Sequence, residues 1–409
     1  METTQWAIKY RPTKFSEVYG CSTIKAMVES DVKNDKWPKS VLLMGQYGSG
    51  KTTCAKLLAM TMMCQHKDAE GNPCGECPDC KAILEERYTR DVKRVCAEDI
   101  RQEGGYTEGI ANFLSQAKTQ PFFGKRKIII FEEIQTILNA GNAKGAIDLL
   151  LKEIENPNSK TYWIFTSMDT IIVPTKGGTK AGPGGFLSRQ VIHKFYPAAD
   201  SDILKYLYNL AHRIEYERDD FKGSLWDWML KNTSKEFCTN GLLEMAKGSE
   251  GSYRQATQML QTCIESNIFD ISEIRKQFGL LEDAIVNKVL YDIANNVKTE
   301  KVIQMLGDID GTNYVRLYYS WARALKEAEM ARIFGKVIYK TKDKESGKTE
   351  THIASADSEG RDLMCYNESL GLANGVNFAK LKAIFAGFSD AEKGFNADLF
   401  IMRLLDCYS

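Results

Sequence analysis

Short apolar runs recur along the first 200 or so residues, and helix-length segments with one apolar face separate them. Runs that are apolar on both faces are typical of strands buried in a parallel sheet, whose connections are helices. The pattern therefore predicts an α/β fold: a parallel sheet covered by helices on both faces. The predicted strands are Val41–Met44, Val92–Cys96, Lys127–Phe131, Tyr162–Ser167 and Val191–Phe195.

Farther along the chain the strand signal fades and helical periodicity dominates. The predicted helices include Asp202–Ala211, Gly241–Ala246 and Tyr253–Glu265. A chain of 409 residues is too long for one ordinary core, since domains usually hold about 100–200 residues. We therefore expect an α/β domain over residues 1–198, a helical domain over 199–270 and a second helical domain over 271–409.

Two segments differ from this pattern of strands and helices. Pro174–Gly185 is rich in glycine and lysine, which predicts a loop without regular structure. Tyr339–Gly360 is rich in Lys, Thr, Glu and Ser, and this composition predicts an exposed hairpin or loop within the second helical domain.

The first predicted strand runs directly into Gly-Gln-Tyr-Gly-Ser-Gly-Lys-Thr at residues 45–52. A glycine-rich turn between a buried strand and a helix presents backbone N–H groups to a triphosphate. The lysine then reaches the terminal phosphates and the threonine hydroxyl reaches Mg²⁺. A flexible turn that precedes Lys-Thr by chance explains the pattern less well. The loop residues expected at the nucleotide are Gly45, Gly48, Ser49, Gly50, Lys51, Thr52 and Thr53.

Two carboxylates, Glu132 and Glu133, follow the predicted strand Lys127–Phe131. Ligands of such sheets bind at the carboxyl ends of the strands, so both side chains are expected near the phosphate loop. We expect Glu132 to hold Mg²⁺ together with Thr52, directly or through water. Glu133 is expected to polarise the water that attacks the terminal phosphate. Two solvated glutamates at a strand end are the alternative.

Four of the eleven cysteines lie within seventeen residues, at Cys64, Cys74, Cys77 and Cys80. Thiolates at this density suit tetrahedral zinc in a closed structural site. An iron–sulfur cluster is the main alternative, because C-x2-C-x2-C also occurs in ferredoxins, although no fourth cysteine followed by proline completes that pattern. Unligated thiols are the remaining reading.

Charge and hydropathy limit the partners and the cellular location that we expect for this protein. Lys plus Arg equals Asp plus Glu at 54 each, so a nucleic acid would have to be held by a local patch. The N-terminus lacks the basic-then-apolar layout of a signal peptide, and no apolar stretch approaches the ~20 residues of a membrane span. We expect a cytoplasmic protein with no membrane contact.

The order of these parts resembles the clamp-loader ATPases of the AAA+ class, and most closely their bacterial gamma/tau subunits. Lys9–Gly20 resembles the family's adenine-proximal segment, which holds an aromatic-Arg-Pro followed by Phe, Val and Gly. The cysteine insert follows the predicted phosphate-loop helix, as the zinc module of gamma/tau subunits does. The resemblance implies base contacts from Tyr10, Arg11, Pro12 and Val18.

Three further residues occupy positions of known motifs in that family. Thr166 lies where the family keeps its first sensor of the terminal phosphate. Ser188-Arg189-Gln190 resembles a Ser-Arg-Cys motif, which implies that Arg189 reaches the nucleotide of a neighbouring subunit. Arg254 lies in a segment similar to the second-sensor helix, which implies a contact with the γ-phosphate of its own chain. An exposed cation is the alternative for either arginine.

The resemblance implies an ATPase that uses ATP, Mg²⁺ and Zn²⁺, with a helical lid (199–270) and an oligomerising collar (271–409) after the AAA+ domain. It implies a homo- or hetero-oligomer, five subunits in the family, that opens a sliding clamp and places it on primer–template DNA. Lys118, Lys125 and Arg126 are candidates for DNA phosphate contacts.

Two features keep other functions open. The family's magnesium carboxylate is normally Asp, and Glu132 is one methylene longer, so hydrolysis is expected to be slow. One alternative is therefore an ATP-binding scaffold subunit that hydrolyses weakly or not at all. Another is a different AAA+ motor, such as a helicase loader or a DNA-repair remodeller. The sequence leaves open whether the source is a bacterium or a bacterial virus acting in its host.

Overall fold

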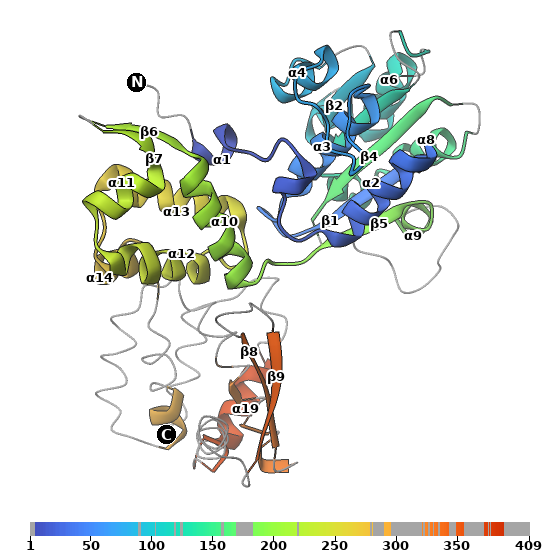
Figure 1. Cartoon of the computed structure of the whole chain (residues 1–409). Coiled ribbons are helices and arrows are strands. Elements are labelled where there is room, and N and C mark those ends of the chain that lie inside the picture. Colours follow the sequence, from blue (N-terminus) through green and yellow to red (C-terminus); the bar gives the residue numbers. More distant parts are fainter. Residues whose placement is uncertain are drawn as a thin grey trace. The chain divides into compact units, whose positions relative to one another are not determined.

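The computed structural model describes residues 5–278 except 89–90, 103, 118–119, 123–125, 157–158, 169–182 and 219–220. Farther on it describes 280, 290–295, 336–342, 349–355, 378–387 and scattered residues between 321 and 376. The chain divides into two compact units, residues 1–269 and 270–409 (Figure 1).

A five-stranded parallel sheet forms the centre of the first unit, with strand order β2-β3-β4-β1-β5. All five predicted strands are confirmed, each to within one residue at either end. β1 lies inside the sheet, where Leu43 pairs with Thr166 on one side and His193 on the other. The strands are β1 (Ser40–Gly45), β2 (Val92–Cys96), β3 (Lys127–Glu132), β4 (Thr161–Ser167) and β5 (Val191–Phe195).

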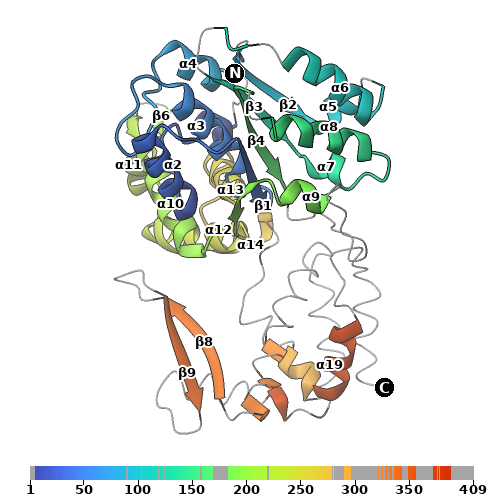
Figure 2. The same cartoon turned by 90° about the vertical axis from the view of Figure 1, so that its right-hand side faces the viewer.

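Helices cover both faces of the sheet, as predicted (Figure 2). One face packs against α2 (Ser22–Asn34), α3 (Lys51–Met63) and α4 (Pro78–Leu84). The other face packs against α5 (Ala97–Gln102), α6 (Tyr106–Ala117), α7 (Gln135–Leu138), α8 (Lys144–Ile154) and α9 (Pro183–Leu187). Each face therefore has its own apolar cluster.

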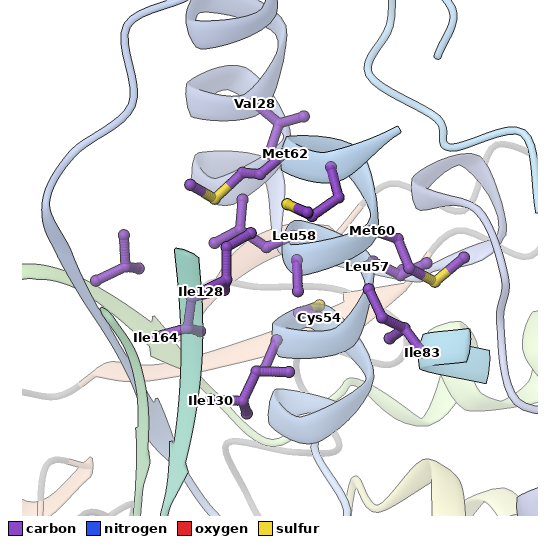
Figure 3. Packing of buried hydrophobic residues seen from close by; sticks show 14 of the residues in the cluster. Val28, Cys54, Leu57, Leu58, Met60, Met62, Ile83, Ile128, Ile130 and Ile164 are labelled. Carbon is purple, nitrogen blue, oxygen red and sulfur yellow. The ribbon is translucent and has the colours of Figure 1, made fainter. Parts of the chain in front are cut away.

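α3 is the most enclosed helix of the first face, because 11 of its 13 residues are buried. Figure 3 shows Leu58 and its neighbours packed between the sheet residues Ile128 and Ile164 and the flanking Val28 of α2 and Ile83 of α4. A helix that is apolar almost all round belongs in a core. This packing fixes the N-terminal turn of α3, which carries the phosphate loop's lysine, at the edge of the sheet.

The rest of the first unit is mainly helical, with α10 (Asp200–Arg213), α11 (Leu225–Asn232), α12 (Leu242–Gly248) and α13 (Tyr253–Ser266). The predicted helices are confirmed, except that Gly241 ends a π-helical turn, Phe237–Gly241, directly before α12. A hairpin of β6 (Glu215–Arg218) and β7 (Phe221–Ser224) was not predicted from the sequence. Four-residue strands are too short to give an alternation signal of their own.

Hydrogen bonds join the helical part to the α/β part, and backbone N–H groups donate two of those described. The Trp6 N–H, at the start of α1 (Trp6–Lys9), donates to the side chain of Gln261 on α13 at 2.8 Å. The Ala198 N–H donates to the carbonyl of Gly251 at 3.1 Å. A 3₁₀ turn, Phe15–Glu17, follows α1 and leads toward α2.

The glycine-rich segment Pro174–Gly185 lies largely outside the described residues, which resume at 183. Its last three residues open α9, so the expectation of no regular structure was wrong there. Pro183 is the first residue of that helix, a position where proline's missing N–H costs nothing.

In the second unit the structure describes α14 (Ile271–Phe278), α19 (Phe378–Gly387) and an antiparallel hairpin. The hairpin pairs β8 (Lys336–Lys342) with β9 (Thr349–Ser355), so the hairpin predicted around Tyr339–Gly360 is confirmed. Among the helices described, none combines the length and the apolar character needed to cross a bilayer.

We expect Gly251→Ala to lower the free energy of unfolding by about 1–3 kcal/mol. Gly251 has a φ of +80°, and a Cβ there would lie 2.7 Å from the backbone nitrogen of Ala198. Gly141→Ala is the matched control, since its Cβ would enter open space. Urea unfolding of both variants measures the difference, and equal stabilities would contradict this reading.

Candidate nucleotide-binding site

The loop between β1 and α3 has a backbone that requires glycine at two positions. Gly48 has a φ of +75° and Gly50 a φ of +98°, a region that residues with a Cβ rarely adopt. A Cβ at Gly48 would also lie 2.0 Å from the Ser252 hydroxyl. The loop therefore turns tightly into the N-terminus of α3, where unpaired N–H groups and the helix dipole favour an anion.

Lys51 points back over this loop. Its ammonium donates to the carbonyl oxygens of Gly45 and Gln46 at 2.7 and 2.6 Å, and its side chain is buried. The predicted phosphate-loop lysine thus lies within the curl of the loop that would hold the phosphates.

A cleft opens beside the loop, lined by the N-terminal segment, the loop and two helices of the helical part. Most of the predicted nucleotide contacts line it: Arg11, Pro12, Val18, Gly48, Ser49, Gly50, Lys51, Thr52, Thr53, Glu133 and Arg254. Tyr10, Gly45, Glu132, Thr166 and Arg189 do not. The Tyr10 ring instead meets Trp6 edge-on at 6.3 Å, and its carbonyl accepts from Arg213.

Three tyrosines form an aromatic wall of this cleft. Tyr206 packs edge-on against Tyr19 and Tyr253, with ring centroids 5.7 and 5.1 Å away, and all three line the cleft. The Tyr206 hydroxyl bonds to Thr257 at 2.8 Å. Burial raises the pKa of Tyr253, so its phenol stays neutral. This wall was not predicted from the sequence, because its residues are far apart in the chain.

Glu133 reaches the cleft from a strained backbone. Its φ is +56°, an uncommon left-handed value for a residue other than glycine. Its N–H donates to the hydroxyl of Thr166 at 3.4 Å, and its carboxylate accepts from Gln135. Thr166 is buried behind it, so in this chain the sensor candidate contacts the cleft through Glu133.

Glu132 is buried next to Arg94. One carboxylate oxygen, Oε2, accepts from Nε and Nη2 of Arg94 at 2.9 and 2.6 Å. The other, Oε1, is buried with no hydrogen-bond partner among the described residues. Mg²⁺ prefers oxygen ligands such as this unpartnered carboxylate oxygen and the Thr52 hydroxyl. The residues present therefore fit this ion.

Arg254 and Arg189 have different surroundings. Arg254 lies in the first turn of α13, over the ring of Tyr47 at 5.3 Å, and donates to its hydroxyl. Arg189 follows α9, pairs with Glu155 and donates to the Gly185 carbonyl at 2.7 Å. Gln190, where the resembled motif has Cys, accepts from the Ser40 hydroxyl at the start of β1.

One DNA candidate can be placed. Arg126 pairs with Asp35 and donates to the Met62 carbonyl at 3.3 Å, so its charge is already matched within the chain. Lys118 and Lys125 lie outside the described residues.

The four clustered cysteines converge. The sulfur atoms of Cys64, Cys74, Cys77 and Cys80 all lie within 4.8 Å of one another. Tetrahedral zinc with Zn–S bonds of about 2.3 Å needs sulfurs about 3.8 Å apart, so the thiols fit this ion. N–H groups of Cys77 and Glu76 donate to the Cys74 sulfur and lower the pKa of this thiol to about 6.

Sequence comparisons agree with the geometry. A family model described as DNA polymerase III, delta subunit, matches residues 21–175. The tau/gamma subunit of DNA polymerase III from Haemophilus influenzae is 22% identical over 309 residues, which cover 75% of this chain. The chain spans only 39% of that relative's length.

A shorter relative matches along its length. The DNA polymerase III gamma subunit of Buchnera aphidicola subsp. Acyrthosiphon pisum is 21% identical over 385 residues, covering 92% of this chain and 95% of the relative. Among solved structures, the Aeropyrum pernix ORC1 protein in complex with DNA aligns with a TM-score of 0.41 at 14% identity. That alignment covers 93% of this chain and 98% of the other.

The parallel sheet, the phosphate loop and these relatives agree with one another. In sequence, the chain is similar to the gamma/tau and delta subunits of DNA polymerase III.

Proposed function

We propose that this chain is an ATP-dependent clamp-loader subunit. It binds ATP, assembles with other clamp-loader subunits, opens a sliding clamp and places it on primer–template DNA in the cytoplasm. The observation that carries this proposal is the cleft, which the phosphate loop lines together with Arg254, Tyr206 and Tyr253 of the helical part. A nucleotide there contacts both parts at once, so its phosphates can set how the two parts close.

Residues of the chain supply most of the chemistry. Lys51 and the N–H groups at the start of α3 hold the terminal phosphates, and Arg254 adds positive charge from α13. Glu133 orients and polarises the attacking water, and Thr166 supports Glu133 through its backbone N–H. Mg²⁺, held by Thr52 and Glu132, would neutralise charge on the phosphates.

The proposal includes assembly, because Arg189 does not line the cleft of its own chain. An arginine outside its own site contributes to catalysis by entering the site of a neighbour, where it stabilises transition-state charge. Arg189 would exchange its partner Glu155 for the γ-phosphate of the next subunit. We propose residues 199–270 as the lid and 271–409 as the collar of a five-subunit assembly.

A scaffold subunit that binds ATP but hydrolyses it weakly is the second candidate. The observation that favours it is the contact of Glu132 with Arg94, which already neutralises the carboxylate expected at Mg²⁺. Turnover of the purified oligomer separates the two candidates.

Glu133→Gln should lower ATP turnover about 10²- to 10⁴-fold while nucleotide affinity stays within twofold, because the amide cannot accept the proton of the attacking water. Turnover with clamp and primed DNA, together with binding of a fluorescent ATP analogue, measures both. Glu108→Gln, in α6 on the far face of the sheet, is the control. Unchanged turnover in Glu133→Gln would exclude its role.

Arg189→Ala should lower turnover of the assembled oligomer about 10³-fold or more, because the charge it supplies in trans is lost. Nucleotide affinity of the isolated chain should not change. Arg87→Ala, an exposed arginine paired with Glu85, serves as control. A weaker nucleotide affinity of the isolated Arg189→Ala chain would show that the arginine acts on its own site.

We also propose a structural zinc ion at the cysteine cluster. Elemental analysis should find about one zinc per chain. Cys77→Ser should lose that zinc and lower the melting temperature, whereas Cys263→Ser, a buried thiol elsewhere, should keep it. Iron in place of zinc, or no metal at all, would overturn this assignment.

A further inference from the structure

We propose that Arg94 is a positioning residue that competes with Mg²⁺ for Glu132 and so raises the Mg²⁺ concentration that nucleotide binding needs. This inference rests on the proposed function in one respect, that the cleft binds ATP with Mg²⁺. It goes beyond that function because it assigns a second cation, the Arg94 guanidinium, to the Glu132 carboxylate that would hold Mg²⁺.

The contact follows from the register of two neighbouring strands. β2 lies beside β3, and Cys96 pairs with Glu132, so Arg94 lies two residues back along the adjacent strand. Its long side chain reaches along the sheet to the carboxylate. Two N–H groups meet the same oxygen, Oε2, at 2.9 and 2.6 Å, which is the range of charge-assisted hydrogen bonds.

Burial of Glu132 strengthens the electrostatic interaction between Glu132 and Arg94. Glu132 is only 7% exposed, so its interaction with the guanidinium is weakly screened by solvent. A divalent cation at the remaining oxygen would meet a carboxylate whose charge is already neutralised. It would also be repelled by the cation beside it, because like charges at short range in a low-dielectric site repel strongly. Arg94 and Mg²⁺ therefore oppose each other at this carboxylate.

Arg94 is itself held in place. Its Nη1 lies 3.3 Å from Oε2 of Glu86, and the other oxygen of Glu86 pairs with Lys56 of α3. Glu86 has a φ of +56° just after α4, the helix that carries Cys80. The guanidinium is thus anchored between two carboxylates, Glu86 on the segment that follows α4 and Glu132 at the end of β3.

The charges around this pair favour the contact with Glu132. Arg11 lines the cleft and interacts with Glu86, Glu132 and Arg94, and burial lowers its pKa. Three cations, Arg11, Lys56 and Arg94, therefore share two carboxylates. A divalent cation that approaches Glu132 would therefore be repelled by these neighbouring cations, and removing Arg94 would reduce that repulsion.

The test uses the full chain and measures binding of a fluorescent ATP analogue while free Mg²⁺ is varied, with a chelated sample as the magnesium-free reference. Arg94→Gln should lower the Mg²⁺ concentration for half-maximal binding at least fivefold, and magnesium-free affinity should change less than twofold. Arg94→Lys, which keeps the charge, should stay within threefold of the wild type. Arg101→Gln, which removes a positive charge paired with Glu98 on α5, should change nothing.

The pairing itself is tested by a double-mutant cycle. In a Glu132→Gln background, Arg94→Gln should have no effect on the Mg²⁺ requirement, because the carboxylate for which the two cations compete is gone. Arg94→Met, which keeps the apolar stem, replaces Arg94→Gln if the latter unfolds. Its melting temperature and circular dichroism show whether the fold is intact.

An unchanged or higher Mg²⁺ requirement in Arg94→Gln and Arg94→Met would overturn the inference, since Arg94 would then orient Glu132 toward the metal or only support the fold. The proposed function would survive that result. A wild-type chain that binds no analogue at any Mg²⁺ concentration would instead overturn both.

Discussion

The burial of α3 against the sheet is the constraint on which the rest of the site depends. Leu58, Met62 and their neighbours pack between β3, β4 and the flanking helices, so the helix has little freedom to shift. Its first turn is therefore fixed at the carboxyl edge of the sheet, directly after β1. Lys51, the helix dipole and the glycine loop obtain their position from apolar contacts farther along the same helix.

The second half of the site comes from a different part of the chain. Arg254 and the tyrosine wall reach the cleft from α10, α13 and the N-terminal segment. A nucleotide bound in this cleft would therefore contact both parts, which also meet directly at the Ala198 and Gly251 backbone contact. This arrangement suits a protein whose conformation depends on whether phosphate is bound, and it requires no special flexibility within either part.

Much of the fold was readable from sequence because buried parallel strands are near-continuous apolar runs. The phosphate loop could be predicted because phosphate binding requires its glycines and Lys51 at a fixed spacing. The hairpin around Tyr216 was missed because its strands have four residues each. The contact of Arg94 with Glu132 could not be predicted, since it depends on the register between two strands 30 or more residues apart. The tyrosine wall could not be predicted because Tyr19, Tyr206 and Tyr253 come from three segments far apart in the chain.

The contact between Ser252 and the phosphate loop affects how a movement of the loop reaches α13. The Ser252 hydroxyl accepts the Gln255 N–H, which caps α13, and the same hydroxyl lies where a side chain at Gly48 would have been. Because Gly48 has no side chain, the phosphate loop lies directly against the N-terminus of α13. This helix has 14 residues and is about 21 Å long. A displacement of the loop would therefore act directly on the first turn of α13, and a rigid helix would pass it on along its length.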